Sequence, residues 1–129
     1  MALLDLDHVN IRTRRLAELV DFYTRIGLSP GPRPPFSFGG AWLYCGSRAV
    51  VHLVEVDETP AGQDPSLEHF ALRGKDLESF LALLDGAGID YRIGVVPGYG
   101  TRQVNIFDPD GNHLHVDFEP PGEAPWSAL

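Results

Sequence analysis

The spacing of hydrophobic and polar residues predicts a strand and then a helix at the start of the chain. Residues 4–12 alternate apolar and polar side chains, which is typical of a strand with two different faces. Leu4 and Leu6 are expected on the same face as His8. After residue 15 the apolar residues recur at helical spacing as far as Gly27, a residue type that favours a helix C-terminus.

A loop and two further strands are expected next. Residues 29–40 are rich in proline and glycine, and they predict a loop because proline lacks the N–H that a central strand needs. Residues 41–56 predict two strands that turn at Gly46 and Ser47, with His52 on the second strand.

The chain then repeats this pattern. Residues 6–28 align with residues 67–89 without a gap, at a constant offset of 67 − 6 = 61. The identical pairs in this alignment are Leu6 and Leu67, His8 and His69, Arg12 and Arg73, Leu16 and Leu77, and Gly27 and Gly88. Asp7 and Glu68 are a conservative match. An internal repeat of this length predicts two copies of one supersecondary unit, each a strand, a helix and three strands.

The second copy is expected to end in a well-specified hairpin. Asp76 is the expected N-cap of its helix. Strands are predicted over residues 91–95, 102–107 and 113–118. The last two are joined by the sequence DPDGN, in which proline presets one turn residue and glycine supplies a positive φ.

These elements predict one domain over residues 1–129 with two modules. The modules are expected over residues 4–56 and 67–118, with a linker over residues 57–66 and a tail over residues 119–129. Trp126 in the tail is a candidate anchor onto the body or a partner subunit.

Composition and charge exclude several classes of function. A net charge of −8 with dispersed basic residues argues against nucleic acid as a partner. No apolar run is long enough to cross a bilayer, and the N-terminus lacks the basic region of a signal peptide. The single cysteine, Cys45, permits no internal disulfide, which suits the cytoplasm. Its apolar neighbours predict a buried or half-buried, inert thiol.

Four of the five histidines fall at positions related by the repeat. His8 and His69 belong to the first strands of the two copies, and His52 and His115 to the last strands, at an offset of 115 − 52 = 63. Two related halves would direct four imidazoles at one centre, and neutral imidazole suits Zn, Ni, Fe and Cu. The alternative is that each histidine is half-buried in its strand and bonded to the backbone.

Several neighbouring residues are candidates for other roles. His113 shares a strand face with His115 and Asp117, so it either lines the pocket or is solvated after the turn. Asp117 either orients a histidine or moves protons. Arg12 and Arg73 are expected in surface ion pairs, with carboxylate binding as the alternative.

These residues resemble the vicinal oxygen chelate superfamily, which includes glyoxalase I, extradiol dioxygenases and the fosfomycin and bleomycin resistance proteins. The resemblance covers about residues 4–118. The segments that carry it are DHVNI, LVDFYTRIGL, VVHLVEV, EHFAL and FDPDGNHLHVDF, of which the DPDGN turn is the most specific. It implies an α+β fold of two tandem βαβββ modules with curled, barrel-like mixed sheets around a divalent metal, often across a homodimer interface.

The resemblance also implies the ligands and the reaction. The family's four ligand positions fall on His8, His52, His69 and His115. In glyoxalase I-like members glutamates usually stand where His52 and His115 stand here, and the ligand glutamate resembles a general base. Its absence either moves proton transfer to Asp117, His113 or Tyr99 or means that the chemistry is different. Tyr99 and Arg102 belong to a segment, residues 96–103, that either contacts an anionic substrate group or is an ordinary loop.

Three functions are consistent with these residues. The first is a metal-dependent lyase or isomerase of glyoxalase type that acts on a small oxygenated substrate through Zn, Ni or Fe(II). The second is an Fe(II)-dependent extradiol-type dioxygenase, which needs open coordination positions. The third is a non-catalytic protein that binds a drug or metabolite, as bleomycin resistance proteins do.

Overall fold

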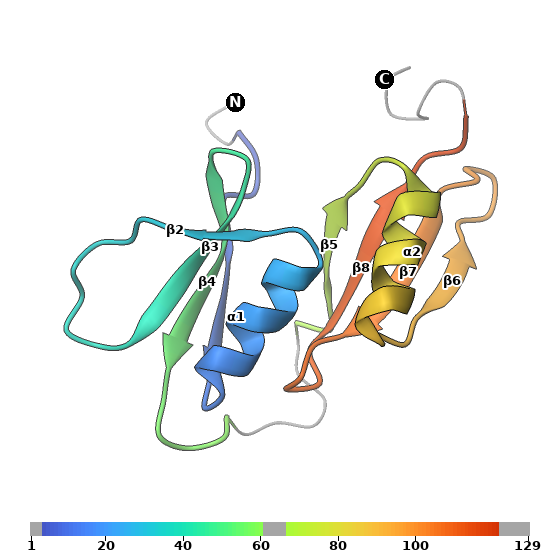
Figure 1. The fold of residues 1–129 in the computed structure, drawn as a ribbon. Helices are drawn as coiled ribbons and strands as arrows, with labels where there is room; N and C mark the ends of the chain where they lie inside the picture. Colours follow the sequence, from blue (N-terminus) through green and yellow to red (C-terminus); the bar gives the residue numbers. More distant parts are fainter. Residues whose placement is uncertain (1–3, 61–66, 122–129) are drawn as a thin grey trace. The chain divides into compact units, whose positions relative to one another are not determined.

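The chain forms two compact units, which are described separately. The computed structural model describes residues 4–60 and 67–121 (Figure 1). The boundary between the two units falls between residues 64 and 65. The described residues of the first unit are 4–60, and those of the second unit are 67–121.

The first unit is a mixed four-stranded sheet with one helix against it (Figure 1). Its elements are β1 (Val9–Thr13), α1 (Leu16–Arg25), β2 (Ser29–Gly31), β3 (Gly40–Cys45) and β4 (Arg48–Glu55). The strand order is β1-β4-β3-β2, in which β1 and β4 are parallel and the other pairs are antiparallel.

The second unit repeats this topology. Its elements are β5 (Phe70–Arg73), α2 (Leu77–Ala87), β6 (Arg92–Val95), β7 (Arg102–Phe107) and β8 (His113–Phe118). The strand order is β5-β8-β7-β6, again with one parallel pair, β5 and β8. The predicted α+β class with two βαβββ units and mixed sheets is therefore confirmed.

Two sequence predictions about strands are corrected. The first strand begins at Val9 and not at residue 4, because its pairing with β4 starts at Val9 and Val51. Leu4 and Leu6 are exposed, and His8 and His69 lie directly before β1 and β5. Residues 29–31, expected in a loop, form the edge strand β2, where Pro30 is tolerated because an edge strand leaves one side unpaired.

Two predictions about single residues have different outcomes. Cys45 was expected to be at least half-buried, but it is exposed, because it ends β3 at the turn to β4. Trp126 lies outside the residues that the structure describes.

Each sheet packs its apolar face against its own helix (Figure 1). The buried apolar residues of the first unit are Ile11, Leu19, Phe22, Tyr23, Ile26, Leu28, Leu43, Val51 and Leu53. Those of the second unit are Leu84, Val104, Ile106, Leu114, Val116 and Phe118. Since neighbouring strand residues point to opposite faces, the residues between these core positions face away from the helix. His52, His113 and His115 are among them.

The predicted N-cap of α2 is confirmed. The carboxylate of Asp76 accepts hydrogen bonds from the Ser79 amide at 3.2 Å and the Ser79 hydroxyl at 2.7 Å. These bonds hold the pKa of Asp76 below its usual value. The helix ends at Gly88, whose φ of 69° is the left-handed conformation that glycine adopts without strain.

The turn between β7 and β8 is organised by one buried carboxylate. Asp108 Oδ1 accepts from the amides of Asp110 and Asn112, both at 2.9 Å, and Oδ2 accepts from the Asn112 side chain at 2.8 Å. Gly111 has a φ of 84°, as the predicted turn requires. This turn fixes the pairing of Phe107 with His113, and therefore the face on which the histidines lie.

In the described part of the chain, every helix is too short or too polar to cross a membrane.

Candidate functional site

In the first unit, His52 is sandwiched between two other rings. Trp42, its partner on β3, stacks on one face of the imidazole with a centroid distance of 4.0 Å and an interplanar angle of 11°. His8 stacks on His52 at 3.7 Å and 12°. The structure therefore brings together the two histidines predicted as ligands in this half of the chain.

The hydrogen bond of His52 fixes which ring nitrogen is free. Nε2 lies 3.1 Å from the carbonyl oxygen of Ala49, so Nε2 carries the proton and donates, and Nδ1 keeps its lone pair. Burial, and secondarily the charge of His8, hold the pKa of His52 below its usual value. A neutral imidazole with a free nitrogen can bind a metal ion, although the backbone bond itself also fits a purely structural histidine.

His8 is tied to the residue that precedes it. Its Nδ1 lies 2.7 Å from Asp7 Oδ2, so that Nδ1 donates and Nε2 keeps a lone pair. The same hydrogen bond holds the pKa of Asp7 below its usual value.

The second unit gathers three imidazoles. The ring centroid of His69 lies 4.7 Å from that of His115 and 5.2 Å from that of His113. His113 and His115 are 6.1 Å apart. His69 and His115 are the pair predicted as ligands, and His113 was predicted to line the pocket or to be solvated. The structure places His113 within the cluster and leaves its side chain 19% exposed.

Asp117 orients His115. Its carboxylate Oδ1 accepts a hydrogen bond from His115 Nδ1, so that Nε2 of His115 keeps its lone pair. Of the two roles that the sequence left open for Asp117, this contact supports the orienting one. Proton transfer by Asp117 stays a prediction.

Glu68 is a member of the cluster that sequence reasoning missed. Its Oε2 is hydrogen-bonded by His69 Nδ1 and lies 3.5 Å from His113 Nδ1. The hydrogen bond from His69 is the main reason why the pKa of Glu68 lies below its usual value. The signal was present in the repeat, because Glu68 aligns with Asp7, which contacts His8 in the same way.

A divalent metal fits the donor chemistry of both units. Metal-bound histidines commonly donate their second ring N–H to a carboxylate or a backbone carbonyl, which fixes the tautomer. His8, His69 and His115 each direct Nδ1 at a carboxylate, and His52 directs Nε2 at a carbonyl. In the second unit, ligand atoms of Glu68, His69 and His113 all lie within 4.8 Å of one another.

The other candidate residues lie away from these contacts. Tyr99 is in the turn between β6 and β7 and is 57% exposed. Arg102 donates to the carbonyl oxygen of Glu119 at 3.1 Å, which makes its guanidinium part of the fold. Arg12 and Arg73 are both exposed. A substrate contact by Tyr99 or Arg102 stays a prediction.

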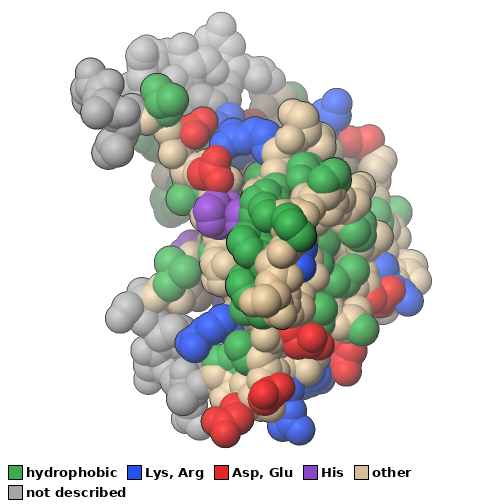
Figure 2. Space-filling model, turned by 90° about the vertical axis from the view of Figure 1, so that its left-hand side faces the viewer, with side chains coloured by type: hydrophobic (Ala, Val, Ile, Leu, Met, Phe, Trp, Pro, Cys, Tyr) green, Lys and Arg blue, Asp and Glu red, His purple; other side chains and the backbone are tan. Residues whose placement is uncertain are grey.

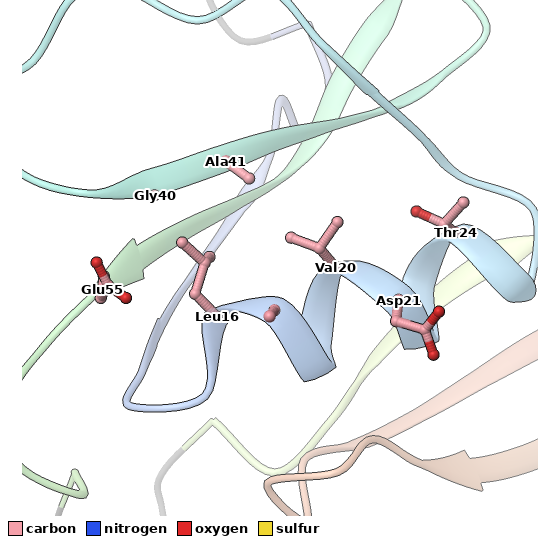
Figure 3. A pocket seen from close by; sticks show the side chains of 8 residues that line it. Leu16, Val20, Asp21, Thr24, Gly40, Ala41 and Glu55 are labelled. Atoms are coloured by element: carbon pink, nitrogen blue, oxygen red, sulfur yellow. The ribbon is translucent and has the colours of Figure 1, made fainter.

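A groove of about 540 Å³ in the first unit lies between α1 and β3 (Figure 3). Leu16, Val20 and Ala41 form its apolar part, and Asp21 and Glu55 carry its charges. Ala41 pairs with the buried Leu53, so it lies on the helix side of the sheet, whereas Trp42 and His52 face the other side. Among the described residues no histidine lines the groove.

The histidine side is accessible. His8 and His69 are exposed residues, and Figure 2 shows imidazoles reaching the surface beside acidic and apolar side chains. A small molecule can therefore reach a ring nitrogen from solvent.

Comparisons with solved structures show the same fold in other proteins. A glyoxalase family protein from Bacillus anthracis is 21% identical with a TM-score of 0.78, over 93% of this chain and 98% of that chain. A glyoxalase/bleomycin resistance protein/dioxygenase domain from a Frankia species is 20% identical with a TM-score of 0.77, over 95% and 96%. The fosfomycin resistance protein FosX from Listeria monocytogenes is 11% identical with a TM-score of 0.70, over 92% and 96%.

The family of the chain is shown by its sequence. The search of curated proteins found no match. The family model of the Glyoxalase/Bleomycin resistance protein/Dioxygenase superfamily matches residues 5–116, which include all five histidines. The chain therefore belongs to the Glyoxalase/Bleomycin resistance protein/Dioxygenase superfamily.

Proposed function

We propose that the chain is a metal-dependent enzyme of glyoxalase type, a lyase or isomerase that acts on a small oxygenated substrate. The metal is Zn, Ni or Fe(II), and its ligands come from His8, His52, His69 and His115. One observation carries the proposal: three of these four imidazoles direct Nδ1 at a carboxylate and keep Nε2 for a ligand bond. A surface histidine that binds no metal does not need a carboxylate at its Nδ1 to fix the tautomer.

The charge of the ligand set supports Lewis-acid chemistry. Four neutral imidazoles do not offset the charge of a divalent ion, whereas carboxylate ligands would. When bound, such an ion polarises a carbonyl or hydroxyl oxygen of the substrate. Burial keeps His52 in the neutral form that this requires, because it holds the pKa of this imidazole down.

The protein groups around the imidazoles fix their orientation. Asp117 holds the ring of His115, Asp7 holds that of His8, and the Ala49 carbonyl holds that of His52. In this proposal Asp117 is a positioning residue, and proton transfer falls to His113 or Tyr99. The exposed hydroxyl of Tyr99 makes no hydrogen bond within residues 4–60 and 67–121, so it is free to meet a substrate.

The proposal includes a cytoplasmic homodimer. The single cysteine, which is exposed, suits a reducing compartment. Sedimentation velocity of the full chain measures the mass, and a monomer at micromolar concentration contradicts this part of the proposal.

Metal content and activity of matched variants test the function. The full chain is stripped with a chelator, reloaded with Zn, Ni or Fe(II), and assayed with hemithioacetals of α-ketoaldehydes. We expect about one ion per chain and loss of both metal and activity in His52→Ala and His115→Ala. Glu78→Gln, which removes an exposed carboxylate in the first turn of α2, is the control and keeps both.

Two other results would assign the alternatives. Oxygen uptake with catechols by the anaerobically Fe(II)-loaded protein would indicate a dioxygenase. A metal content well below one ion per chain after reloading would indicate a binding protein that works without metal.

A further inference from the structure

Asn105 determines the tautomer of His113. The side-chain amide nitrogen of Asn105 donates to the carbonyl oxygens of Gln103, at 3.2 Å, and Arg92, at 3.3 Å. These two acceptors fix the orientation of the amide, so that its oxygen faces His113 Nε2 at 2.9 Å. His113 therefore donates from Nε2, and in its neutral form Nδ1 is an unprotonated lone pair.

This lone pair faces a carboxylate. His113 Nδ1 lies 3.5 Å from Glu68 Oε2. Two acceptors at that distance repel each other unless a cation lies between them, either a proton on the imidazole or a metal ion. The Nδ1 of His69 contacts the same carboxylate oxygen, so that three donor atoms converge within 4.8 Å of one another.

We propose that Glu68, His69 and His113 form a divalent metal site contained within the second unit, independent of His8 and His52. Two imidazoles and one carboxylate suit Zn, Ni, Co or Fe(II) rather than Mg or Ca. Glu68 and His69 are largely exposed, with side-chain exposures of 71% and 42%, so that the side chains adjust easily to the shorter metal–ligand distances.

Of the two described units, only the second holds all the parts of this site. At the repeat offset of 63, the counterpart of His113 is residue 113 − 63 = 50, which is Val50, an apolar residue with no ligand atom in its side chain. Asn105 likewise corresponds to Trp42, because 105 − 63 = 42. The first unit thus has Asp7 and His8, which correspond to Glu68 and His69. At the positions that correspond to His113 and Asn105 it has neither a third metal-binding side chain nor an amide to orient one.

The new site and the centre proposed above make different use of His69. Here the metal binds His69 Nδ1, and the ring proton moves to Nε2. In the centre formed by His8, His52, His69 and His115, His69 binds the metal through Nε2. Its Nδ1 then keeps the proton that it donates to Glu68. A neutral imidazole has one lone pair, so each His69 serves one of the two sites. The inference does not depend on the proposed reaction.

Zinc titrations of the full chain and its variants test the site. Zn²⁺ affinity is measured by competition with a chromophoric chelator. We expect Glu68→Gln and His113→Ala to weaken binding at least tenfold, and the control Glu78→Gln to leave it within about twofold. Unchanged binding in both Glu68→Gln and His113→Ala would overturn the inference.

The pattern of losses separates this inference from the proposed function. Loss of zinc in His52→Ala and His115→Ala, with Glu68→Gln unaffected, overturns the inference and supports the four-histidine set. No zinc binding by the parent chain means that a proton alone lies between His113 and Glu68, which overturns the inference, whereas reloading with Ni or Fe(II) still tests the proposed function.

A second measurement does not depend on variants. Histidine nitrogen spectra of the ¹⁵N-labelled parent chain are recorded before and after one equivalent of Zn²⁺. We expect the zinc-induced shift at Nδ1 of both His69 and His113. A shift at Nε2 of His69 with His113 unchanged would contradict the site.

Discussion

Trp42 lies flat against His52, with 4.0 Å between the ring centroids and an angle of 11° between the rings. The two residues are partners in the pairing of β3 with β4, so the sheet itself brings the rings together. The indole therefore holds the imidazole of a predicted metal ligand in one plane.

Replacing Trp42 should weaken metal binding through His52. We expect Trp42→Leu to lower the Zn²⁺ or Ni²⁺ affinity roughly threefold to tenfold, because a stacked aromatic pair contributes about 0.5–1.5 kcal/mol and the ring loses its orientation. Trp42→Phe keeps a stacking ring and should stay within about twofold. Chelator competition measures both affinities, and equal values for Trp42→Leu and the parent would contradict an orienting role.

Replacing Asp117 should weaken metal binding, and any loss of activity should follow from that loss of metal. Since its carboxylate accepts from His115 Nδ1, we expect Asp117→Ala to lower metal affinity roughly 10–100-fold and Asp117→Asn to have a smaller effect. Isothermal titration calorimetry measures the affinities. Unchanged metal affinity with lost turnover would instead identify Asp117 as a proton carrier.

Asp76 should stabilise α2 in a pH-dependent way. Asp76→Ala removes the cap and places alanine at a φ of 65°, so we expect a fall in Tm on the order of a few degrees. Asp76→Asn accepts the same hydrogen bond and tolerates the same backbone, and should lose less.

The lowered pKa of Asp76 sets the direction of this pH dependence. The folded state binds the proton less readily than the unfolded chain, so the stabilisation is complete above the unfolded value of 3.8 and is lost as the pH falls through the lower folded pKa. Thermal melts from strongly acidic to neutral pH should therefore show the parent and Asp76→Asn converging at acid pH. A difference that does not change with pH would contradict this origin.

Gly40 should resist substitution because of backbone contact. A Cβ at this position would lie 2.2 Å from the carbonyl oxygen of Leu53 on the paired strand. We expect Gly40→Ala to lower the free energy of unfolding by about 1–3 kcal/mol, as overpacking does. At Gly94, also within a strand, the nearest atom would be 3.9 Å away, and Gly94→Ala should change stability little. Urea denaturation compares the two, and equal effects would contradict the steric explanation.

The repeat and the turn made most of the fold predictable from the sequence. Strands β7 and β8 have the predicted bounds, because apolar residues alternate along β8 and Asp108 and Gly111 specify the turn between the two strands. The edge strand β2 was missed because proline argues against a strand, and only the pairing with β3 shows that Pro30 is tolerated.

The site was predictable only in part. The repeat identified the pairs His8 with His52 and His69 with His115, and the structure places the members of each pair in contact. It aligned Glu68 with Asp7, but the contact of Glu68 with His69 depends on how the chain bends before β5, which the alignment does not report. The free nitrogen of His113 depends on the orientation of the Asn105 amide, which no sequence pattern reports.

The Asp108 turn has a consequence for the imidazoles that lie beyond it. Side chains alternate along β8, so sliding this strand by a single position against β7 would drive His113 and His115 toward α2 and expel Leu114 into water. The Asp108 turn thus selects the face of the sheet on which His113 and His115 lie. Damage to the turn would therefore abolish the proposed metal binding while every donor residue is still present in the chain.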